Sequence, residues 1–446
     1  MCNIIIKLPK TVEEILDRLE SAGFAAYAVG GAVRDLIRGI EPHDFDLTTA
    51  AKPEQVMEVF KGETIIPTGL QHGTVTLVID HVPYEITTFR GEGEYTDHRR
   101  PDQVEFIDSI EADLARRDFT AGAIAYSPKR GLCDPFGGVG DVYRGILRAV
   151  GDPMTRFRED GLRILRALRF ASACGFTIEE ETAAALHEGK HLVRPIAAER
   201  KYTELTKTLC GANVRKILCE FGDVLAEVIP ELEPTFGCPQ HTSYHDRDVW
   251  IHTLDALQAI FNEPILRWTM LLHDIAKPQC RYTDARGVDH FKTHPEKGAP
   301  IAGEVLARLK AERVTREEVT LLIELHDIDL PDDRGGVHRL LIRHGKERIL
   351  RLLAVKEADL AAKSPYGQTH GRDVILPWVK QTVCSLIDEG APLSVRDLAL
   401  RGSDLAPLGY RGREVGETLA SLLDGVTRGV PNEKEALLAY LNQRSK

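Results

Sequence analysis

The chain has 446 residues, 43% of them hydrophobic and 28% charged, which is ordinary for a globular protein of roughly two to four domains. It contains no apolar run near the roughly 20 residues that span a bilayer, and its first residues lack the apolar core of a signal peptide, so we expect a cytoplasmic protein with no membrane partner. The net charge of −11 excludes a uniformly basic surface.

The first 150 residues mix strand and helix patterns. Ala25–Val29 has the composition of a short strand, and Thr74–Ile79 and Val82–Phe89 are typical of the two arms of a β-hairpin. Apolar residues at helical spacing cover Pro53–Phe60 and Ser109–Tyr126. This part of the chain is therefore predicted to be a mixed α and β domain.

After Gly151 the strand patterns largely stop and helical patterns dominate. We predict an α+β chain with a head of mixed sheet and helices (1–150), an all-α neck (151–215), a helical body (216–370) and a helical tail (371–446). The expected helices beyond the head are Arg156–Cys174, Glu179–Glu188, Glu199–Leu209, Val249–Phe261, Pro300–Leu309, Glu317–His326 and Lys346–Ala362.

Two aspartates, Asp44 and Asp46, follow a Gly30-Gly31 pair at a short distance. On a strand, residues two apart share a face, where both carboxylates can hold Mg²⁺ ions against the phosphates of a nucleotide. The glycines let the backbone approach a triphosphate at a helix N-terminus, and Arg34 adds a donor to the same anion. Each motif alone is more often a solvated strand end or a simple turn, but their order and spacing together favour nucleotidyl transfer.

Further motifs follow in order: Arg116-Arg117-Asp118-Phe119-Thr120, Asp134-Pro135-Phe136-Gly137-Gly138, Glu159-Asp160-Gly161-Leu162-Arg163, and Glu199-Arg200 with Glu204. With the glycine pair and the aspartates, they make the chain resemble class II CCA-adding tRNA nucleotidyltransferases of the polymerase-β-like superfamily. The resemblance implies template-independent addition of CTP and ATP to the 3′ end of tRNA, with Mg²⁺ at Asp44 and Asp46. It further implies that Arg117 binds the nucleotide and that Asp118 orients Arg117 or the sugar.

Base choice without a template is expected at Asp160 and Arg163, placed at i and i+3 on one predicted helix. An acceptor-only Asp beside a donor-only Arg matches the Watson–Crick edges of cytosine and adenine and leaves groups unpaired against uracil and guanine. Arg166 and Arg169 continue the stripe toward the phosphates. Taken alone, the segment is better explained as an amphipathic helix with leucines inside and arginines outside, and only its place after the aspartate motif favours the functional interpretation. Glu85 is equally a third carboxylate or a solvated strand residue.

The RNA partner is expected to meet a local basic surface, with no role for DNA. Between Arg144 and Lys216, 14 Lys and Arg residues outnumber 9 Asp and Glu residues. The expected RNA contacts are Arg99, Arg100, Arg200 and Lys201.

Two variants within the family can be weighed. The stretch from Gly91 to Pro101 resembles the loop that A-adding members need, which disfavours CC-only activity, and Leu70–Val75 resembles the CCA-adding pattern rather than that of poly(A) polymerases. Full CCA addition and A addition alone both stay open. Gly122 stands where the family usually has Asn, which puts catalytic efficiency in doubt.

The helical body carries a second set of residues with metal-binding chemistry. His252, His273-Asp274 and Asp359 follow the order of HD-domain phosphohydrolases, with His294 and His326 as additional candidate ligands. Imidazoles and carboxylates from separate helices can hold a divalent transition metal that activates water against a phosphoester. An enzyme that is chiefly a phosphohydrolase on RNA ends, and an RNA-binding protein on an inactive transferase scaffold, are the competing hypotheses. The intact aspartate and Asp160/Arg163 pairs speak against both.

Overall fold

The computed structural model describes residues 6–91 and 105–444. The chain divides into two compact units, Met1–Pro230 and Glu231–Lys446. The first unit contains a seven-stranded sheet within these described residues, and the second is helical apart from one short hairpin. The predicted α+β class, with a mixed sheet first and helices after it, is confirmed. The finer division into head, neck, body and tail remains a prediction.

The sheet of the first unit has the strand order β3-β4-β5-β2-β1-β6-β7. Its only parallel pair among the described residues is β2 with β5, which places Asp46 directly opposite Glu85. The predicted hairpin is confirmed as β4 and β5, and Asp80 and His81 at its turn both have positive φ, as a tight two-residue hairpin turn requires. The strands are β1 (Ala26–Val29), β2 (Asp46–Thr49), β3 (Thr64–Gly69), β4 (Thr74–Ile79), β5 (Val82–Thr88), β6 (Ala125–Ser127) and β7 (Gly131–Cys133).

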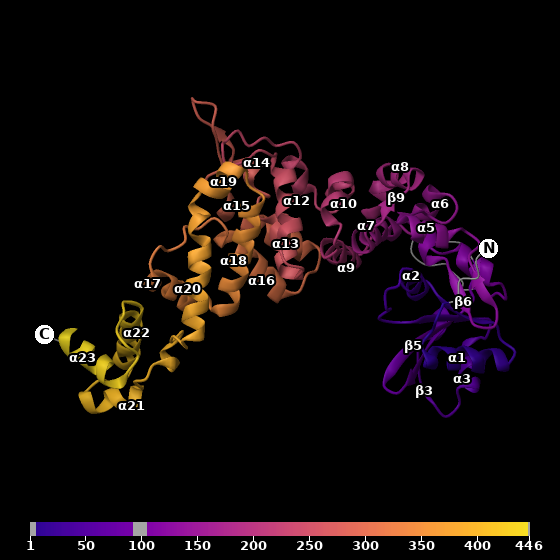
Figure 1. The fold of residues 1–446 in the computed structure, drawn as a ribbon, viewed down its shortest axis with the longest axis horizontal. Coiled ribbons are helices and arrows are strands. Elements are labelled where there is room, and N and C mark those ends of the chain that lie inside the picture. Colours follow the sequence, from indigo (N-terminus) through magenta and orange to yellow (C-terminus); the bar gives the residue numbers. More distant parts are fainter. Residues whose placement is uncertain (1–5, 92–104, 445–446) are drawn as a thin grey trace. The chain divides into compact units, whose positions relative to one another are not determined.

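Helices of the first unit flank the sheet and then continue as a helical extension beyond it (Figure 1). A short parallel pair, β8 (Ile146–Leu147) and β9 (Thr177–Ile178), joins the two parts. The helices are α1 (Lys10–Ser21), α2 (Gly31–Ile37), α3 (Pro53–Val59), α4 (Ile110–Ala115), α5 (Gly138–Arg144), α6 (Pro153–Glu159), α7 (Leu162–Cys174), α8 (Glu180–Gly189), α9 (Ala198–Leu209), α10 (Val214–Glu220) and α11 (Gly222–Ala226).

Four predicted helices are wrong in extent. Two begin earlier than predicted, α15 (His294–Arg308) before Pro300 and α16 (Arg313–Leu325) before Glu317. The other two are shorter or interrupted. The expected helix Ser109–Tyr126 ends at Ala115, because the chain then turns to deliver Ala125–Ser127 to the sheet as β6. The expected helix Arg156–Cys174 is broken into α6 and α7 at Asp160-Gly161. A Cβ on Gly161 would lie 2.3 Å from the carbonyl oxygen of Leu192, so a glycine is needed where the chain packs this closely.

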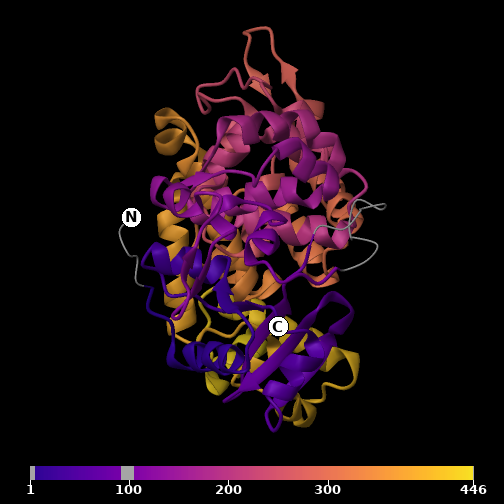
Figure 2. The same ribbon diagram turned by 90° about the vertical axis from the view of Figure 1, so that its right-hand side faces the viewer.

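The second unit is a layered set of helices, and its β10–β11 hairpin projects from the helical surface (Figure 2). Its C-terminal end has its own apolar cluster, which includes Leu398, Leu405, Leu422 and Leu437. The elements are α12 (Val249–Ala259), α13 (Pro264–Leu272), α14 (Lys277–Cys280), β10 (Tyr282–Thr283), β11 (Asp289–His290), α15 (His294–Arg308), α16 (Arg313–Leu325), α17 (Arg334–His344), α18 (Lys346–Ala361), α19 (Pro365–His370), α20 (Leu376–Asp388), α21 (Gly402–Leu405), α22 (Arg413–Thr427) and α23 (Lys434–Arg444). Within residues 6–91 and 105–444, no helix combines the length and apolar character needed to cross a membrane.

Candidate functional site

The glycine pair forms a sharp turn between β1 and α2. Gly30 has φ of 73° and caps α2, and its N–H donates to the carbonyl of Ile124 at 3.0 Å. A Cβ at this position would lie 3.1 Å from Nη1 of Arg117, so glycine lets this arginine approach the turn. Gly31 then opens α2. The turn therefore brings a helix N-terminus and a guanidinium to the end of the sheet at which β2 begins.

Three carboxylates lie near this same end of the sheet. Asp46 is the first residue of β2 and pairs in register with Glu85 of β5, whereas Asp44 lies two residues before the strand. The expectation that both aspartates lie on a strand is therefore wrong in that detail. Desolvation, together with the charges of Asp44 and Glu85, raises the pKa of Asp46, and Arg117 opposes the rise. Asp44 and Glu85 lie close enough to Asp46 to disfavour its ionisation, and carboxylates grouped in this way form a natural receptor for divalent cations.

A cleft of about 400 Å³ lies beside these carboxylates. It brings together most of the predicted nucleotide-binding side chains from the sheet, from the segment after α4, from α7 and from α9. Its lining includes Asp46, Glu85, Arg117, Asp118, Asp160, Arg163, Arg166 and Arg200.

Three predicted basic residues lie outside this lining. Arg34 pairs with Asp35 at 2.8 Å, and Arg169 pairs with Glu204 at 3.2 Å. Lys201 donates to the carbonyl of Arg194 at 2.8 Å. Arg34 and Arg169 nevertheless lie near Arg166 of the lining, because all three guanidiniums contact the ring of Phe170. Arg99, Arg100 and most of the predicted loop from Gly91 to Pro101 fall outside the described residues.

The motif after α4 holds its two charged side chains by different partners. Arg117 lies against Asp113, with Nη2 3.5 Å from Oδ2, and burial lowers the pKa of its guanidinium despite that carboxylate. Asp118 accepts from Nε of Arg166 at 2.6 Å. Burial is the largest influence on the pKa of Asp118 and would raise it, but the charge and hydrogen bond of Arg166, the charge of Arg163 and the N–H of Phe119 together lower the pKa. The resemblance implied that Asp118 orients either Arg117 or the sugar. In the structure, the ion-pair partner of Asp118 is Arg166.

The pair predicted to select the base, Asp160 and Arg163, has a different setting from the one expected. Asp160 is extended and lies between α6 and α7, where its Oδ1 accepts from the backbone N–H of Leu162 at 2.9 Å and so caps α7. Its Oδ2 lies 3.3 Å from Nη2 of Arg200. Arg163, in the first turn of α7, donates to the carbonyls of Arg156 and Arg116 at 3.0 Å each and to Glu159. Both side chains line the cleft in fixed positions, although they do not share a single helix.

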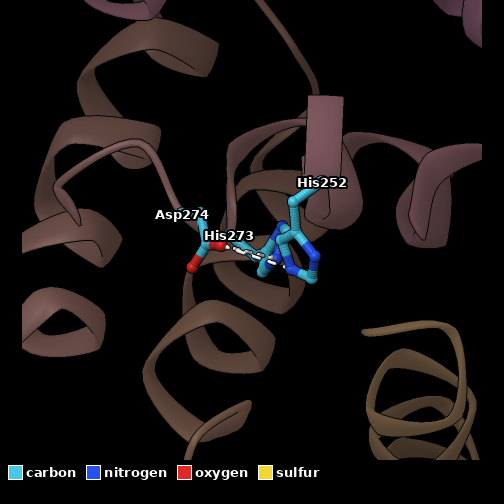
Figure 3. Close-up of side chains that lie close together, drawn as sticks. All are labelled: His252, His273 and Asp274. Carbon is cyan, nitrogen blue, oxygen red and sulfur yellow. Dashed lines mark ion pairs between the residues drawn. The ribbon is translucent and has the colours of Figure 1, made fainter. Parts of the chain in front are cut away.

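The second unit holds a histidine–aspartate cluster made of six predicted residues: His252, His273, Asp274, His294, His326 and Asp359. Asp274 is its centre. Nε2 of His273 lies 3.2 Å from Oδ2 of Asp274, and Nε2 of His294 lies 3.3 Å from Oδ1. Figure 3 shows His252 and His273 directed at this carboxylate. Nε2 of His252 is 2.9 Å from Oδ1 of Asp359.

The histidine rings of this cluster are oriented by the backbone. Nδ1 lies within hydrogen-bond distance of a main-chain carbonyl in each ring, which leaves Nε2 facing inward; the pairs are His252 with Ala362, His273 with Met270, His294 with Phe291 and His326 with Ile323. Nε2 of His273 and both oxygens of Asp274 are buried, and among the described residues their polar contacts are ion pairs within the cluster and with Lys277. Oriented imidazoles around such a carboxylate fit a metal site. Two subsets, each containing Asp274, have the proximity that a metal ion needs.

The surroundings of the cluster include charged residues that the sequence reasoning did not single out. Nζ of Lys277 is 2.7 Å from Asp274, and Nζ of Lys363 is 2.9 Å from Asp359. Burial by itself would lower the pKa of His273, but the two carboxylates raise it to about 9. The sequence could have indicated these two lysines by their spacing, because Lys277 follows Asp274 by three residues and Lys363 follows Asp359 by four.

A mixed sheet with carboxylates at one edge, facing an arginine-lined cleft, defines a nucleotidyltransferase head. Residues 26–148 match the family described as the poly A polymerase head domain, and residues 175–235 match the one described as the probable RNA and SrmB-binding site of polymerase A. The CCA-adding enzyme of Levilactobacillus brevis is 50% identical over 430 residues, covering 95% of each chain. That of Geobacillus kaustophilus is 33% identical over 442 residues, covering 97% of this chain and 96% of its own.

A solved structure agrees with these relatives. The crystal structure of the Bacillus stearothermophilus CCA-adding enzyme in complex with CTP matches with a TM-score of 0.70 and 30% identity, covering 98% of both chains. The chain belongs to the CCA-adding enzyme family, whose members are metal-dependent nucleotidyltransferases.

Proposed function

We propose that the chain builds or repairs the CCA 3′ end of tRNA from CTP and ATP, releasing pyrophosphate. The observation that carries this proposal is the single cleft that joins Asp46 and Glu85 on the sheet to Asp160, Arg163 and Arg166 beside α7. A cleft of about 400 Å³ lined by both acidic and basic groups is suited to a nucleotide with a charged triphosphate and a polar base. The cytoplasmic location of the protein stays a prediction from the sequence.

Base choice rests on two side chains whose positions are set by other groups. Asp160 is held by the backbone of Leu162 and by Arg200, and Arg163 by two carbonyls and Glu159. Cytosine and adenine each present an amino donor beside a ring-nitrogen acceptor, which an Asp and an Arg can satisfy together. Uracil and guanine present the opposite order, so the same pair would leave buried groups unpaired. Because the pair is fixed before the base arrives, selection needs no template strand.

The carboxylate group of Asp44, Asp46 and Glu85 is where Mg²⁺ would be held. Burial first, and then the charges of Asp44 and Glu85, raise the pKa of Asp46, and the oxygen ligands are the type that Mg²⁺ prefers. When bound, the metal would supply charge stabilisation for the attacking 3′ hydroxyl and the leaving pyrophosphate. Arg117 and Arg166 line the same cleft and would neutralise the remaining phosphate charge.

The decisive experiment is incorporation of labelled CTP and ATP, with Mg²⁺, into tRNA transcripts that end before the first C, after C and after CC. We expect C to be added to the first two transcripts and A to the third. Addition of A alone to the CC-ended transcript would make the chain an A-adding specialist that needs a partner. No incorporation into any transcript would overturn the proposal and leave hydrolysis at the histidine–aspartate cluster as the main candidate activity.

The histidine–aspartate cluster supports a second candidate function, hydrolysis of phosphoesters on RNA ends. The four histidines with inward Nε2 atoms, together with Asp274 and Asp359, would hold a divalent transition metal. When bound, the metal would supply an activated water for attack on phosphorus. Lys277 and Lys363 lie beside the two carboxylates and would offset the charge of a phosphate. Release of phosphate or opening of a 2′,3′-cyclic phosphate by the metal-loaded chain, and its loss in Asp274→Asn, tests this function.

A further inference from the structure

Three guanidiniums surround the ring of Phe170 in the third turn of α7. The Cζ atoms of Arg169, Arg166 and Arg34 lie 4.2, 5.2 and 5.6 Å from the ring centroid. The edge of the ring also meets Phe119, whose centroid is 5.9 Å away at an interplanar angle of 77°. Such distances are those of cation–π contacts, which attract a cation to the ring without competing for its N–H donors.

Each of these arginines has a carboxylate partner as well as the ring. Arg166 binds Asp118 at 2.6 Å, Arg169 binds Glu204 of α9 at 3.2 Å, and Arg34 binds Asp35 of α2 at 2.8 Å. The ring is therefore the common neighbour of groups from α2, α7 and the segment after α4, and α9 is linked to it only through the pairing of Glu204 with Arg169.

Three like charges so close together need such a common neighbour. Burial lowers the pKa of Arg169, and the positive charges of Arg166 and Arg34 lower it further, against the charge of Glu204. An aliphatic side chain of similar size would fill the space but would leave these cations to repel one another without the attraction of the ring. The positions of Arg34 and Arg166 relative to each other would then be less well fixed.

The two arginines matter for different parts of the nucleotide site. Arg34 follows the Gly30-Gly31 turn by one turn of α2, and Arg166 holds Asp118 in the wall of the cleft. From this geometry we infer that Phe170 is a positioning residue, which fixes the glycine turn and the arginine stripe of α7 relative to each other and so sets the affinity for the incoming nucleotide. The inference rests on the proposed function of the cleft. None of these contacts joins Phe170 directly to the carboxylates of Asp46 and Glu85 or to the proposed base-selecting pair.

The test compares Phe170→Leu with Phe170→Tyr in the CTP and ATP incorporation assay. We expect Phe170→Leu to raise KM for both nucleotides about tenfold, with kcat and the KM for tRNA changed by less than about twofold. Phe170→Tyr keeps the ring face and should restore the nucleotide KM to within about twofold of the original chain. Phe221→Leu is a matched control, because it removes a fully buried ring of the same unit that stacks on His187 rather than on arginines.

Three results would overturn the inference. The first is an unchanged nucleotide KM in Phe170→Leu, and the second is an equal rise in Phe170→Tyr or Phe221→Leu, which would indicate a packing role only. A fall in kcat alone, in step with a lower fraction of folded protein, would also count against it. The proposed function fails separately, because absence of incorporation by the original chain would be seen before any variant is made.

Discussion

Nε of Arg166 lies 2.6 Å from Oδ2 of Asp118, an ion pair that joins α7 to the segment after α4 across the wall of the nucleotide cleft. Asp118 also accepts from its neighbour's backbone, the N–H of Phe119, at 3.0 Å. The carboxylate is therefore committed to holding an arginine and a turn. A nucleotide entering the cleft meets an arginine whose direction is already determined, which lowers the entropic cost of binding its phosphates.

Asp118→Asn should weaken this arrangement without emptying the space. The amide keeps the shape of the side chain but loses the charge, so Arg166 is held less firmly, and we expect about a tenfold rise in KM for CTP and ATP. The free energy of unfolding should fall by about 1–3 kcal/mol, measured by denaturant titration. Because the folded pKa of Asp118 lies below the usual value, its stabilisation is present above the unfolded pKa and is lost only as the pH falls through the folded pKa. The difference between the two proteins should therefore be the same at pH 6 and pH 8.

Asp46→Asn should have the opposite effect on stability. The pKa of Asp46 is raised in the folded chain, so the folded state binds the proton more tightly and the ionised carboxylate costs folding free energy at neutral pH. The amide removes that cost, and Tm should rise slightly at pH 7 and converge with that of the original chain as the pH falls below the unfolded pKa. Nucleotide addition should drop about a thousandfold or more, because a metal ligand is lost.

The control for this variant is the response to Mg²⁺. The original chain should gain Tm when Mg²⁺ is added, and Asp46→Asn should gain much less, since the cation no longer relieves the repulsion with Asp44 and Glu85. A lower Tm for the variant at pH 7 would contradict a carboxylate whose ionisation is disfavoured by burial and by the charges of Asp44 and Glu85. Retained addition would remove Asp46 from the site.

Local patterns predicted the elements of the head well, but the break before α7 shows their limit. A helical repeat of leucines and arginines runs across Asp160-Gly161, so periodicity alone extends one helix through it. The break depends on the approach of Leu192 to Gly161, a contact between segments distant in sequence. The Asp-Gly pair, with Asp160 as a cap for Leu162, was the local indication of a new helix start.

The site shows the same division between local and distant information. The aspartates and the glycine turn were visible as motifs, whereas the role of Glu85 depends on the parallel pairing of β2 with β5, which no local pattern specifies. The contact of Arg34 with Phe170 and the pairing of Arg169 with Glu204 likewise come from tertiary packing. In the second unit, the order of histidines and aspartates predicted the members of the cluster, but the backbone carbonyls that turn each Nε2 inward appear only in the fold.

Gly122→Asn tests the departure of this chain from its family. A Cβ at Gly122 would meet only Oδ1 of Asp118, at 3.7 Å, and the backbone there has negative φ, so a side chain fits without strain. An amide next to Asp118 gains a hydrogen-bonding group for the sugar, and we expect kcat/KM for CTP and ATP to rise by about three- to fivefold. Gly122→Ala adds the Cβ without the amide and should give no gain. Equal rates for the two variants would mean that the amide has no role here.

Asp160→Ala should change which nucleotides are used rather than how well the chain folds. In the proposed base-selecting pair this carboxylate is the acceptor, so we expect addition of C and A to fall and the preference over U and G to shrink by about a hundredfold. Loss of the cap on α7 should cost about 1 kcal/mol of stability. Arg200→Ala removes the other partner of Asp160 and is the control, with the cap intact. Competition of all four labelled nucleotides for a CC-ended transcript measures the preference, and an unchanged preference in Asp160→Ala would exclude base selection at this residue.

Asp274→Asn should separate the two proposed sites. Asp274 belongs to both metal-binding subsets of the cluster, so its loss should weaken binding of a divalent transition metal by at least about a hundredfold, while CCA addition is unaffected. Asp388→Asn, at an exposed position of the same unit, is the control and should bind metal as the original chain does. His294→Ala removes a member of one subset only and should lower the metal content per chain without abolishing it. Elemental analysis after dialysis against the metal, with the Tm gained on adding it, gives both readouts. Because the two sites use separate residues in separate units, loss of both metal binding and CCA addition in a folded Asp274→Asn would overturn the two-site assignment.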